Sequence, residues 1–395
     1  MLALALVGAC VAVSWPADSP LVPGIGGRLS GSHRWAWTYL GCECAAFLAY
    51  AFALLLLERR AAAVTPVAAL AAAIQLVPVG APLLLSSDAW TYWDYGRIAA
   101  VHGGNPYRDT PADFSADPAF PYVGEDWRRT TSVYGPLFTL ASEPVALAAG
   151  ASPDAAAWIY KTLAAVAMLG VSGLAALLAR RPAFACAFVG WNPLLALHFG
   201  GGGHNDAWMA ALILAALALA ASGRRQWAGG AWAAAVFVKW IPLLFLPLRA
   251  LEARASGRRV AHLGLAAVTA AVALVSTWQF GWRWLGAFGP LARTANHETR
   301  FALPHRLASL GVPDDVALGL LLAGFALAYL ALLRQASAGR ARLALTAGLL
   351  LLATPYLAPW YVVWVLPLAG MEEDRTAQLL ALALCAYLLP QTVPL

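Results

Sequence analysis

Long, unbroken apolar runs are the feature that most limits what this chain can fold into. Ala45–Leu57 and Ala207–Ala221 are two examples, and with their flanks such runs approach the roughly 20 residues of a bilayer-crossing helix. Hydrophobic residues make up 61% of the 395 residues and charged residues only 12%, about half the charge of an average soluble domain. Soluble and disordered classes are therefore excluded. A β-barrel is disfavoured because its strands alternate apolar and polar residues, so we predict an all-α polytopic membrane protein.

Arginine placement predicts how the chain is oriented in the membrane. Of the 26 basic residues only two are lysines, and most arginines fall in short connectors between apolar runs. By the positive-inside rule these connectors face the cytoplasm. Following them along the chain predicts about 9–11 full spans in one domain, residues 1–395. The first is Leu2–Trp15, which lacks the basic start of a signal peptide. The same reasoning places residues 86–133 and 281–315 in two extracytoplasmic segments.

Three apolar segments do not fit as simple spans. Tyr134–Gly150 is short, and we predict that it is re-entrant or interfacial. Trp227–Leu248 is interrupted at Lys239–Pro242, and Leu343–Leu368 is interrupted at two prolines; both must start and end inside. Proline kinks a helix, and broken helices at membrane depth are tolerated where they are buried in protein or line a cavity. We therefore predict a cavity beside these breaks.

The acidic residues gather in the first extracytoplasmic segment, which holds seven of the 20 carboxylates. Asp88 is the first charged residue after a long apolar run, and Trp90 and Tyr92 follow it. A carboxylate beside a cavity can act as a base on a substrate hydroxyl, whereas we expect most of the other acids simply to solvate a loop. Asp94 and Arg97 are three residues apart, so they can pair on a helix and support Asp88.

A second polar group follows four consecutive glycines, residues 200–203. His204, Asn205 and Asp206 come next, directly before an apolar run. Glycines let the backbone approach a ligand closely, and a helix N-terminus favours an anion. Asn205 or Asp206 also suits a helix N-cap, but three polar residues in series are more than a cap requires. Ligand contact is the prediction, and capping is its alternative.

The remaining cations are candidates for binding an anion. Lys161 and Lys239 lie inside apolar segments, where charges are costly and usually functional, although Lys161 is near enough to a span end to reach the interface. Arginine matches phosphate oxygens, so the second extracytoplasmic segment is equally consistent with an anion site or a solvated loop. Its polar residues are Arg293, His297, Glu298, Arg300, His305 and Arg306. His204, His297 and His305 could bind a divalent metal, but neither the histidines nor the five scattered cysteines have metal-ligand spacing. A metal is therefore possible but not indicated, and no other cofactor is predicted.

Five short motifs together resemble a known family. They are Gly-Asn-Pro-Tyr (Gly104–Tyr107), Asp-Trp-Arg (Asp126–Arg128), Tyr-Gly-Pro-Leu (Tyr134–Leu137), Trp-Asn-Pro-Leu (Trp191–Leu194) and Gly-His-Asn-Asp (Gly203–Asp206). Over about Ser86–Leu248 this combination resembles the GT-C membrane glycosyltransferases. More narrowly it resembles the actinobacterial polyprenol-phosphate-mannose-dependent α-1,6-mannosyltransferases that extend lipomannan in the cell envelope, which are relatives of the family 87 enzymes. Pro359-Trp360-Tyr361 adds weaker support.

The resemblance implies a GT-C-type fold in the plasma membrane, with a long first catalytic loop on the extracytoplasmic side. It implies inverting transfer of a sugar, most simply mannose, from a polyprenyl-phosphate donor to a glycan or glycolipid acceptor. Asp88 would be the base, and the other site residues would bind donor or substrate. These are Asp94, Arg97, Tyr134, His204, Asn205, Asp206, Lys239, His297, Arg300 and Arg306. The expected partners are this donor, the acceptor and the bilayer, and nothing indicates nucleic acid.

Two other function classes share some of these features. A transporter or flippase for a polyprenyl-linked or other lipid also uses broken helices and intramembrane charges. Such a carrier needs its polar groups near the midplane, whereas here they cluster in the outer segments, and the chain has no inverted halves. A non-catalytic membrane subunit would not explain the His204–Asp206 segment. The glycosyltransferase is therefore the favoured function.

Overall fold

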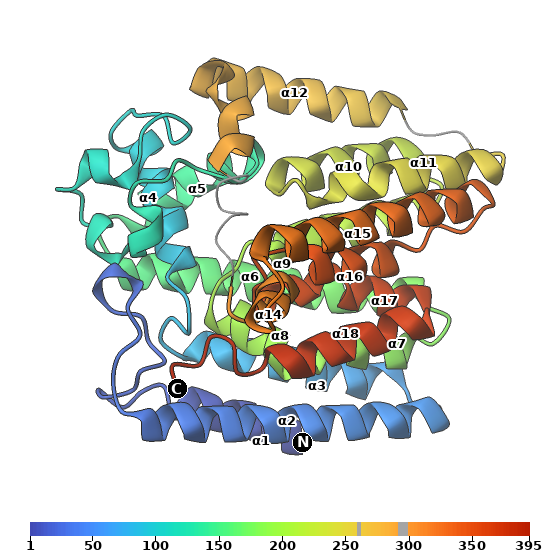
Figure 1. Ribbon diagram of the computed structural model, residues 1–395, viewed down its shortest axis with the longest axis horizontal. Coiled ribbons are helices and arrows are strands. Elements are labelled where there is room, and N and C mark those ends of the chain that lie inside the picture. The colour runs from blue at the N-terminus through green and yellow to red at the C-terminus, as the bar shows by residue number, and fades with distance from the viewer. Residues whose placement is uncertain (259–261, 291–298) are drawn as a thin grey trace.

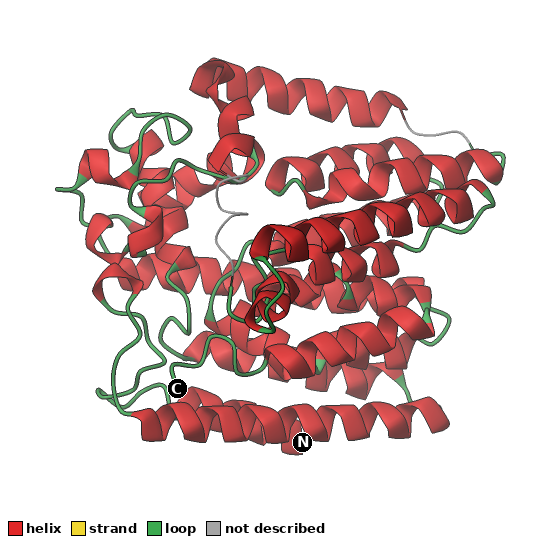
Figure 2. Ribbon diagram, viewed as in Figure 1, coloured by secondary structure: helices red, strands yellow, loops and turns green. Residues whose placement is uncertain are grey.

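The computed structural model describes residues 1–258, 262–290 and 299–395. In this part of the chain there are 17 α-helices and no β-strand, which confirms the all-α prediction (Figure 2). Most of the helices lie roughly alongside one another, and the region of α4 (Asp88–Ala100) and α5 (Pro136–Ala149) forms one end of the bundle (Figure 1). The connectors rich in arginine lie at the opposite end, because α9 (Asp206–Ala221) runs from Asp206 to the Arg224-Arg225 connector.

Among the described residues, four helical stretches are long and apolar enough to cross a membrane. They are α2 (His33–Arg59), α6 (Pro153–Leu178), the stretch His262–Pro290 that contains α12 (His262–Phe280), and α15 (Asp314–Ser337). A bent pair makes a fifth if it counts as one span. The remaining apolar helices have 10–17 residues and include α1 (Leu2–Ala12), α3 (Val64–Leu76), α16 (Leu343–Ala353) and α18 (Arg375–Leu388). Helices with the length and composition of membrane spans are thus present. Several of the apolar runs that were expected to be full spans form helices of only 10–17 residues.

The bent pair is a break that the sequence reasoning did not predict. α7 (Pro182–Gly190) and the stretch Pro193–Gly201, which begins with α8 (Pro193–Ala196), meet at 53°. Between them Asn192 takes an extended conformation, and its side chain accepts a hydrogen bond from the Leu195 N–H at 3.1 Å. A residue before proline is disfavoured in the helical conformation, and asparagine is a good N-cap, so the chain ends one helix here and starts another.

Both predicted breaks are present. α10 (Arg225–Val238) ends where Lys239 takes an extended conformation, and a short turn, Ile241–Leu244, leads into α11 (Phe245–Ala255). Likewise α16 ends at Ala353, and the turn Pro359–Trp364 leads into α17 (Leu366–Glu372). Each interruption therefore leaves an irregular turn inside the bundle, as the prolines indicated.

Residues 86–133, predicted to be the first extracytoplasmic segment, are not simply a solvated loop. It begins with α4, whose residues 89–99 are all buried against α5 and α6. The Tyr92 ring contacts the rings of Tyr134, Phe138 and Tyr160 with centroid distances of 5.1, 4.9 and 5.4 Å. At Gly96 the two helices touch so closely that a Cβ atom would lie 2.3 Å from the Ser142 carbonyl oxygen. The aromatic residues of this segment therefore form core, and only the short turns after α4 make a loop.

Lys161 of α6 holds the segment that leads into α4. Its ammonium group is buried and donates hydrogen bonds to the carbonyl oxygens of Val79 (3.1 Å), Pro82 (3.4 Å) and Ala81. Backbone carbonyls can stabilise a buried cation without a carboxylate partner. Lys161 therefore serves the fold, and it does not reach toward the interface.

We expect Lys161→Met to lower the free energy of unfolding by about 2 kcal/mol, because charge-assisted hydrogen bonds to these carbonyls would be lost. The measurement is thermal or denaturant unfolding of the purified protein followed by tryptophan fluorescence. Replacing the exposed Arg334 by Met serves as the control and should have little effect. Equal stability of both variants and the wild type would contradict this role of Lys161.

Candidate active site

Asp88, the first residue of α4, meets His204 across 116 positions of sequence. Its Oδ2 atom lies 3.2 Å from His204 Nδ1 and 3.3 Å from the Tyr92 hydroxyl, which donates to it. The backbone N–H of Asp88 donates to Ser86 Oγ at 3.2 Å. His204 is completely buried, whereas 17% of the Asp88 side chain is exposed. The two strongest predictions from the sequence are thus brought into direct contact, with the carboxylate on the accessible side.

The glycine run positions His204 through close backbone contact. The Leu84 N–H donates to the Gly201 carbonyl oxygen at 3.0 Å, and a Cβ atom on Gly201 would lie 2.7 Å from Leu84 Cδ1. Gly203 has a φ of +73°, which favours glycine. The glycines therefore let the turn before His204 pack against the segment that leads into Asp88. The imidazole of His204 then stacks on Trp360, with centroids 3.6 Å apart and planes 12° apart.

Asp206 and Lys239 form a second charged pair. Lys239 Nζ lies 2.7 Å from Asp206 Oδ1, and the Trp364 indole N–H donates to the same oxygen at 2.6 Å. Asp206 is fully buried, and 16% of the Lys239 side chain is exposed. The ammonium group also lies 4.8 and 5.5 Å from the ring centroids of Tyr361 and Trp364, within cation–π range. Lys239 is therefore held by one carboxylate and two aromatic rings.

A cavity of about 250 Å³ lies between these two pairs. Asp88 and Lys239 contribute its charged groups, and aromatic rings make most of the wall. The other lining residues are Trp127, Val133, Tyr134, Trp240, Ile241, Leu350, Thr354, Tyr356, Trp360, Tyr361 and Trp364. An apolar, aromatic cavity with a few convergent polar groups is the usual form of a small-molecule site. Both predicted helix breaks contribute to this wall.

The His204–Asp206 segment lies behind the wall. None of its three residues lines the cavity; His204 reaches Asp88 and Asp206 reaches Lys239. Asn205 occupies the N-cap position of α9 without a side-chain cap hydrogen bond, and both of its amide atoms are buried without a hydrogen-bond partner in the described residues. The segment therefore orients the two charged residues that face the cavity.

Opposing influences act on the Asp88 carboxyl group. Burial raises its pKa, while the hydrogen bond and charge of His204 and the charge of Lys239 lower it. The lowering influences win, and the pKa of Asp88 lies below its ordinary value. A carboxylate must be ionised to accept a proton, so Asp88 is in the required form at neutral pH.

The expected pairing of Asp94 with Arg97 is wrong. Arg97 Nε instead donates to both oxygens of Asp117, at 2.7 and 3.0 Å, and His102 Nε2 lies 2.6 Å from Asp117 Oδ2. Asp94 Oδ2 is buried and has no hydrogen-bond partner within the described part of the chain. Burial and the charge of Asp117 raise the pKa of Asp94 to about 7. Neither Asp94 nor Arg97 lines the cavity, so their connection to Asp88 runs through α4.

Arg300 and Arg306 do not line the cavity. Arg306 donates to the Tyr387 hydroxyl at 3.1 Å, and both Arg300 and Arg306 lie over the ring of Phe301. Thr299 nevertheless ties this segment to the cavity region, because its hydroxyl donates to the Leu357 carbonyl oxygen at 2.9 Å. His297 falls outside the described residues. Within those residues, no three His, Cys, Asp or Glu side chains are grouped as a metal site.

Aromatic residues are what the sequence reasoning missed. Tyr134 was predicted and lines the cavity, but Trp240, Tyr356 and Trp364 were not singled out. The available signal was their position beside the two predicted helix breaks, at Lys239–Pro242 and Pro355–Pro359. Aromatic residues beside a helix break are therefore as good an indicator of the cavity wall as the charged residues are.

Comparison with known proteins identifies the family. Residues 1–255 match a family model described as "Alpha-(1->6)-mannopyranosyltransferase, N-terminal domain". A Mycolicibacterium smegmatis protein, "Probable alpha-(1->6)-mannopyranosyltransferase", is 32% identical over 141 residues, which are 34% of this chain and 25% of the relative. "Alpha-(1->6)-mannopyranosyltransferase A" of Corynebacterium glutamicum is 29% identical over 139 residues, 34% of this chain and 28% of the relative.

These alignments cover about a quarter of each curated relative, and no solved structure matches the chain. The family model covers well over half of the chain and includes Asp88, His204, Asp206 and Lys239. The chain therefore belongs to the alpha-(1->6)-mannopyranosyltransferase family.

Proposed function

We propose that this protein transfers mannose from a polyprenyl-phosphate donor to a glycan or glycolipid acceptor, with inversion at the anomeric carbon. The reaction would take place at the end of the bundle that holds Asp88, opposite the arginine connectors, on the extracytoplasmic side. The observation that carries the proposal is the ionised Asp88 carboxylate on the wall of an aromatic cavity that also contains Lys239. Family membership supports the transferred sugar.

In the proposed reaction Asp88 takes the proton from the acceptor hydroxyl, and the hydroxyl oxygen attacks the anomeric carbon. The bond from that carbon to the phosphate oxygen breaks on the opposite face, and the polyprenyl phosphate leaves with the bonding electron pair. Because this leaving group departs as an anion, a cation stabilises it and no general acid is required. Lys239 is the cation on the cavity wall.

The other residues of the site would hold these two groups in place. His204, locked between Asp88 and Trp360, fixes the carboxylate. Asp206 and Trp364 fix the ammonium group of Lys239. The aromatic wall offers apolar faces to the sugar ring and to the first isoprene units of the donor. Asp94, Arg97, Arg300 and Arg306 would act from outside the cavity, through α4 or through the segment after Thr299.

The test is transfer by the purified full-length protein from polyprenyl-phosphate-mannose to a short α-mannoside. Donors with glucose or galactose on the same lipid, and a nucleotide-linked mannose, serve as comparisons. We expect an α-1,6-linked product from the lipid-linked mannose alone, with the linkage and anomeric configuration read by NMR. Absence of transfer and of hydrolysis with every lipid-linked donor would instead favour a transporter or flippase.

The pKa of Asp88 gives a pH prediction. Because His204 helps to keep this pKa below its ordinary value, wild-type kcat/KM should stay level as the pH falls from neutral until it approaches that low pKa. In His204→Gln this lowering influence is lost while burial remains, so the pKa of Asp88 rises and the acidic limb of the pH profile moves to higher pH. His102→Gln, a histidine bound to Asp117, is the control and should leave the limb unchanged. Coincident limbs for His204→Gln and the wild type would contradict the assignment.

A further inference from the structure

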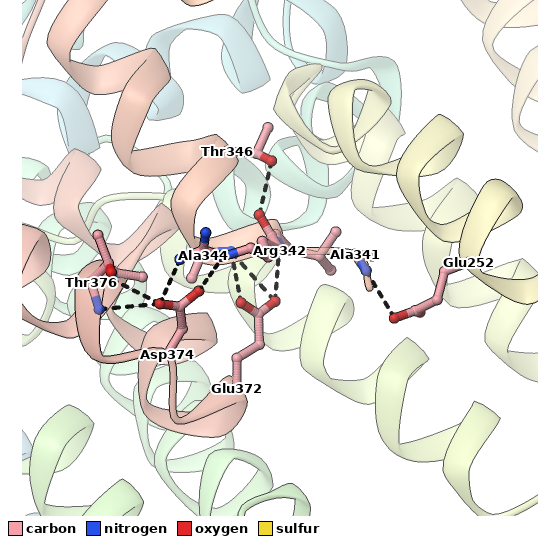
Figure 3. A network of polar contacts seen from close by, with 10 residues as sticks. Glu252, Ala341, Arg342, Ala344, Thr346, Glu372, Asp374 and Thr376 are labelled. Carbon is pink, nitrogen blue, oxygen red and sulfur yellow. Dashed lines mark hydrogen bonds and ion pairs between the residues drawn. The ribbon is translucent and has the colours of Figure 1, made fainter. Parts of the chain in front are cut away.

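The acidic residues at the arginine-rich end of the bundle are bound to internal partners. Glu372 accepts the backbone N–H of Leu343 at 2.9 Å, at the start of α16. Asp374 holds the guanidinium group of Arg342 at 2.6 and 2.9 Å (Figure 3). Glu252 accepts the Ala341 N–H at 3.1 Å in the same region (Figure 3). These carboxylates therefore do not neutralise other arginines nearby.

The two acidic residues near the end of α2 are also bound to internal partners. Glu58 binds Arg375 at 2.5 Å, and Glu373 accepts the backbone N–H of Arg181 at 2.8 Å. The Arg181 guanidinium is also in use, since it donates to the carbonyl oxygens of Leu57 (3.1 Å) and Glu58 (2.9 Å). This set ties the end of α2 to the starts of α7 and α18.

Three neighbouring arginines have no such partner. Arg59, Arg60 and Arg180 are exposed, and within the described part of the chain their guanidinium groups form no hydrogen bond or ion pair. With Arg181 they line a cavity of about 430 Å³ between the end of α2 and the start of α7. Its other walls include Leu57, Val64, Pro182 and Phe184, which are apolar. The cavity thus combines three unpaired guanidinium groups with an apolar wall, and the carboxylate that also lines it, Glu58, is bound to Arg375.

The position of this cavity limits what it can bind. α2 and α6 are long and apolar enough to cross a membrane, which puts their ends near the bilayer surface, where lipid phosphates are found. Tyr160 of α6 contacts Tyr92 beside Asp88 and stands 18 residues before the end of the helix at Leu178, so roughly 27 Å of helix separate the candidate active site from this cavity. The donor bound at the active site is therefore not the ligand of this cavity.

We propose that the cavity between α2 and α7 binds a phosphate-bearing anion, supplied by the phosphodiester headgroup of an anionic membrane lipid. Guanidinium forks match phosphate oxygens in geometry and charge. Basic pockets between membrane helices are the kind of site that holds anionic headgroups. The apolar wall would contact the glycerol backbone and the first acyl carbons. The proposal is independent of the transferase chemistry.

The test compares two triple variants with equal charge. Arg59→Gln/Arg60→Gln/Arg180→Gln removes the unpaired cations of the cavity and spares Arg181, which the fold uses. Arg254→Gln/Arg334→Gln/Arg340→Gln removes three exposed arginines from the same end of the bundle, and none of these lines the cavity. The readout is the rise in Tm of the full-length protein in phosphatidylcholine vesicles as phosphatidylglycerol is added, with inorganic phosphate as a separate arm.

We expect phosphatidylglycerol to raise the Tm of the wild type and of the control variant. The cavity variant should need at least roughly tenfold more lipid for the same rise, because three arginine contacts are absent. A rise produced equally by inorganic phosphate would assign the site to a soluble anion and overturn the lipid source. Equal responses of the two triple variants would overturn the cavity itself, because surface charge alone would then explain the effect.

Discussion

Asp88→Asn is expected to lower the rate of mannosyl transfer by roughly 10³-fold, the scale of effect of a positioned general base. Asparagine has nearly the same shape, so it keeps a hydrogen-bond acceptor for Tyr92 and His204. It carries no negative charge and cannot take the acceptor proton. The loss should appear in kcat and kcat/KM alike, with little change in KM, because the carboxylate acts in the transition state.

The matched control for this prediction is Asp94→Asn on the same helix. Asp94 is buried and does not line the cavity, so its replacement should change transfer far less. Thermal unfolding of both variants checks that α4 remains in place. Near wild-type turnover by Asp88→Asn, combined with loss of turnover in Asp94→Asn, would show that the wrong carboxylate has been chosen as the base.

Lys239→Met is expected to lower the free energy of unfolding by about 3–5 kcal/mol, as is found when one partner of a buried ion pair is removed. Asp206 is fully buried, and after the substitution its carboxylate retains only the Trp364 indole N–H. The cost arises mainly from the uncompensated charge. Denaturant unfolding of the purified protein measures it.

A second substitution separates stability from chemistry at this pair. In Lys239→Met/Asp206→Asn neither member of this pair is charged, so most of the lost stability should return. Transfer should not return, because the cation proposed to face the departing phosphate is still absent. Recovery of both stability and transfer in the double variant would mean that Lys239 serves the fold alone.

The helix breaks show how far the sequence predicts this fold. Proline removes a hydrogen-bond donor wherever it stands, so the breaks near Pro242 and Pro355 could be located without a structure. The break at Asn192 carried a similar signal in the proline that follows it, but its apolar surroundings favoured one continuous run. Apolar composition predicts burial, not helix length, so several apolar runs form helices of 10–17 residues, and four described stretches, or five with the bent pair, have the length of a span.

The candidate site, too, could be predicted only in part from the sequence. Asp88 and His204 stood out because polar residues are rare in this chain and these follow apolar runs directly. Partners far apart in sequence could not be read from local spacing. Asp94 and Arg97 have the spacing of a pair, but Arg97 binds Asp117 instead, because both carboxylate oxygens of Asp117 accept its hydrogen bond. The contact of Lys239 with Asp206, across 33 positions, needed the structure.

The stacking of Trp360 on His204 has a consequence for how the protein is made. Asp88, His204 and Lys239 are synthesised first, and Trp360, which covers His204, lies 156 positions after it. At ordinary translation speeds the growing chain spends roughly ten to thirty seconds without that cover. A chain that stopped at residue 255 would contain the entire stretch that matches the family model and would still lack the Trp360 side of the cavity. If the cavity is the site of transfer, as proposed, activity requires that the last third of the chain has docked.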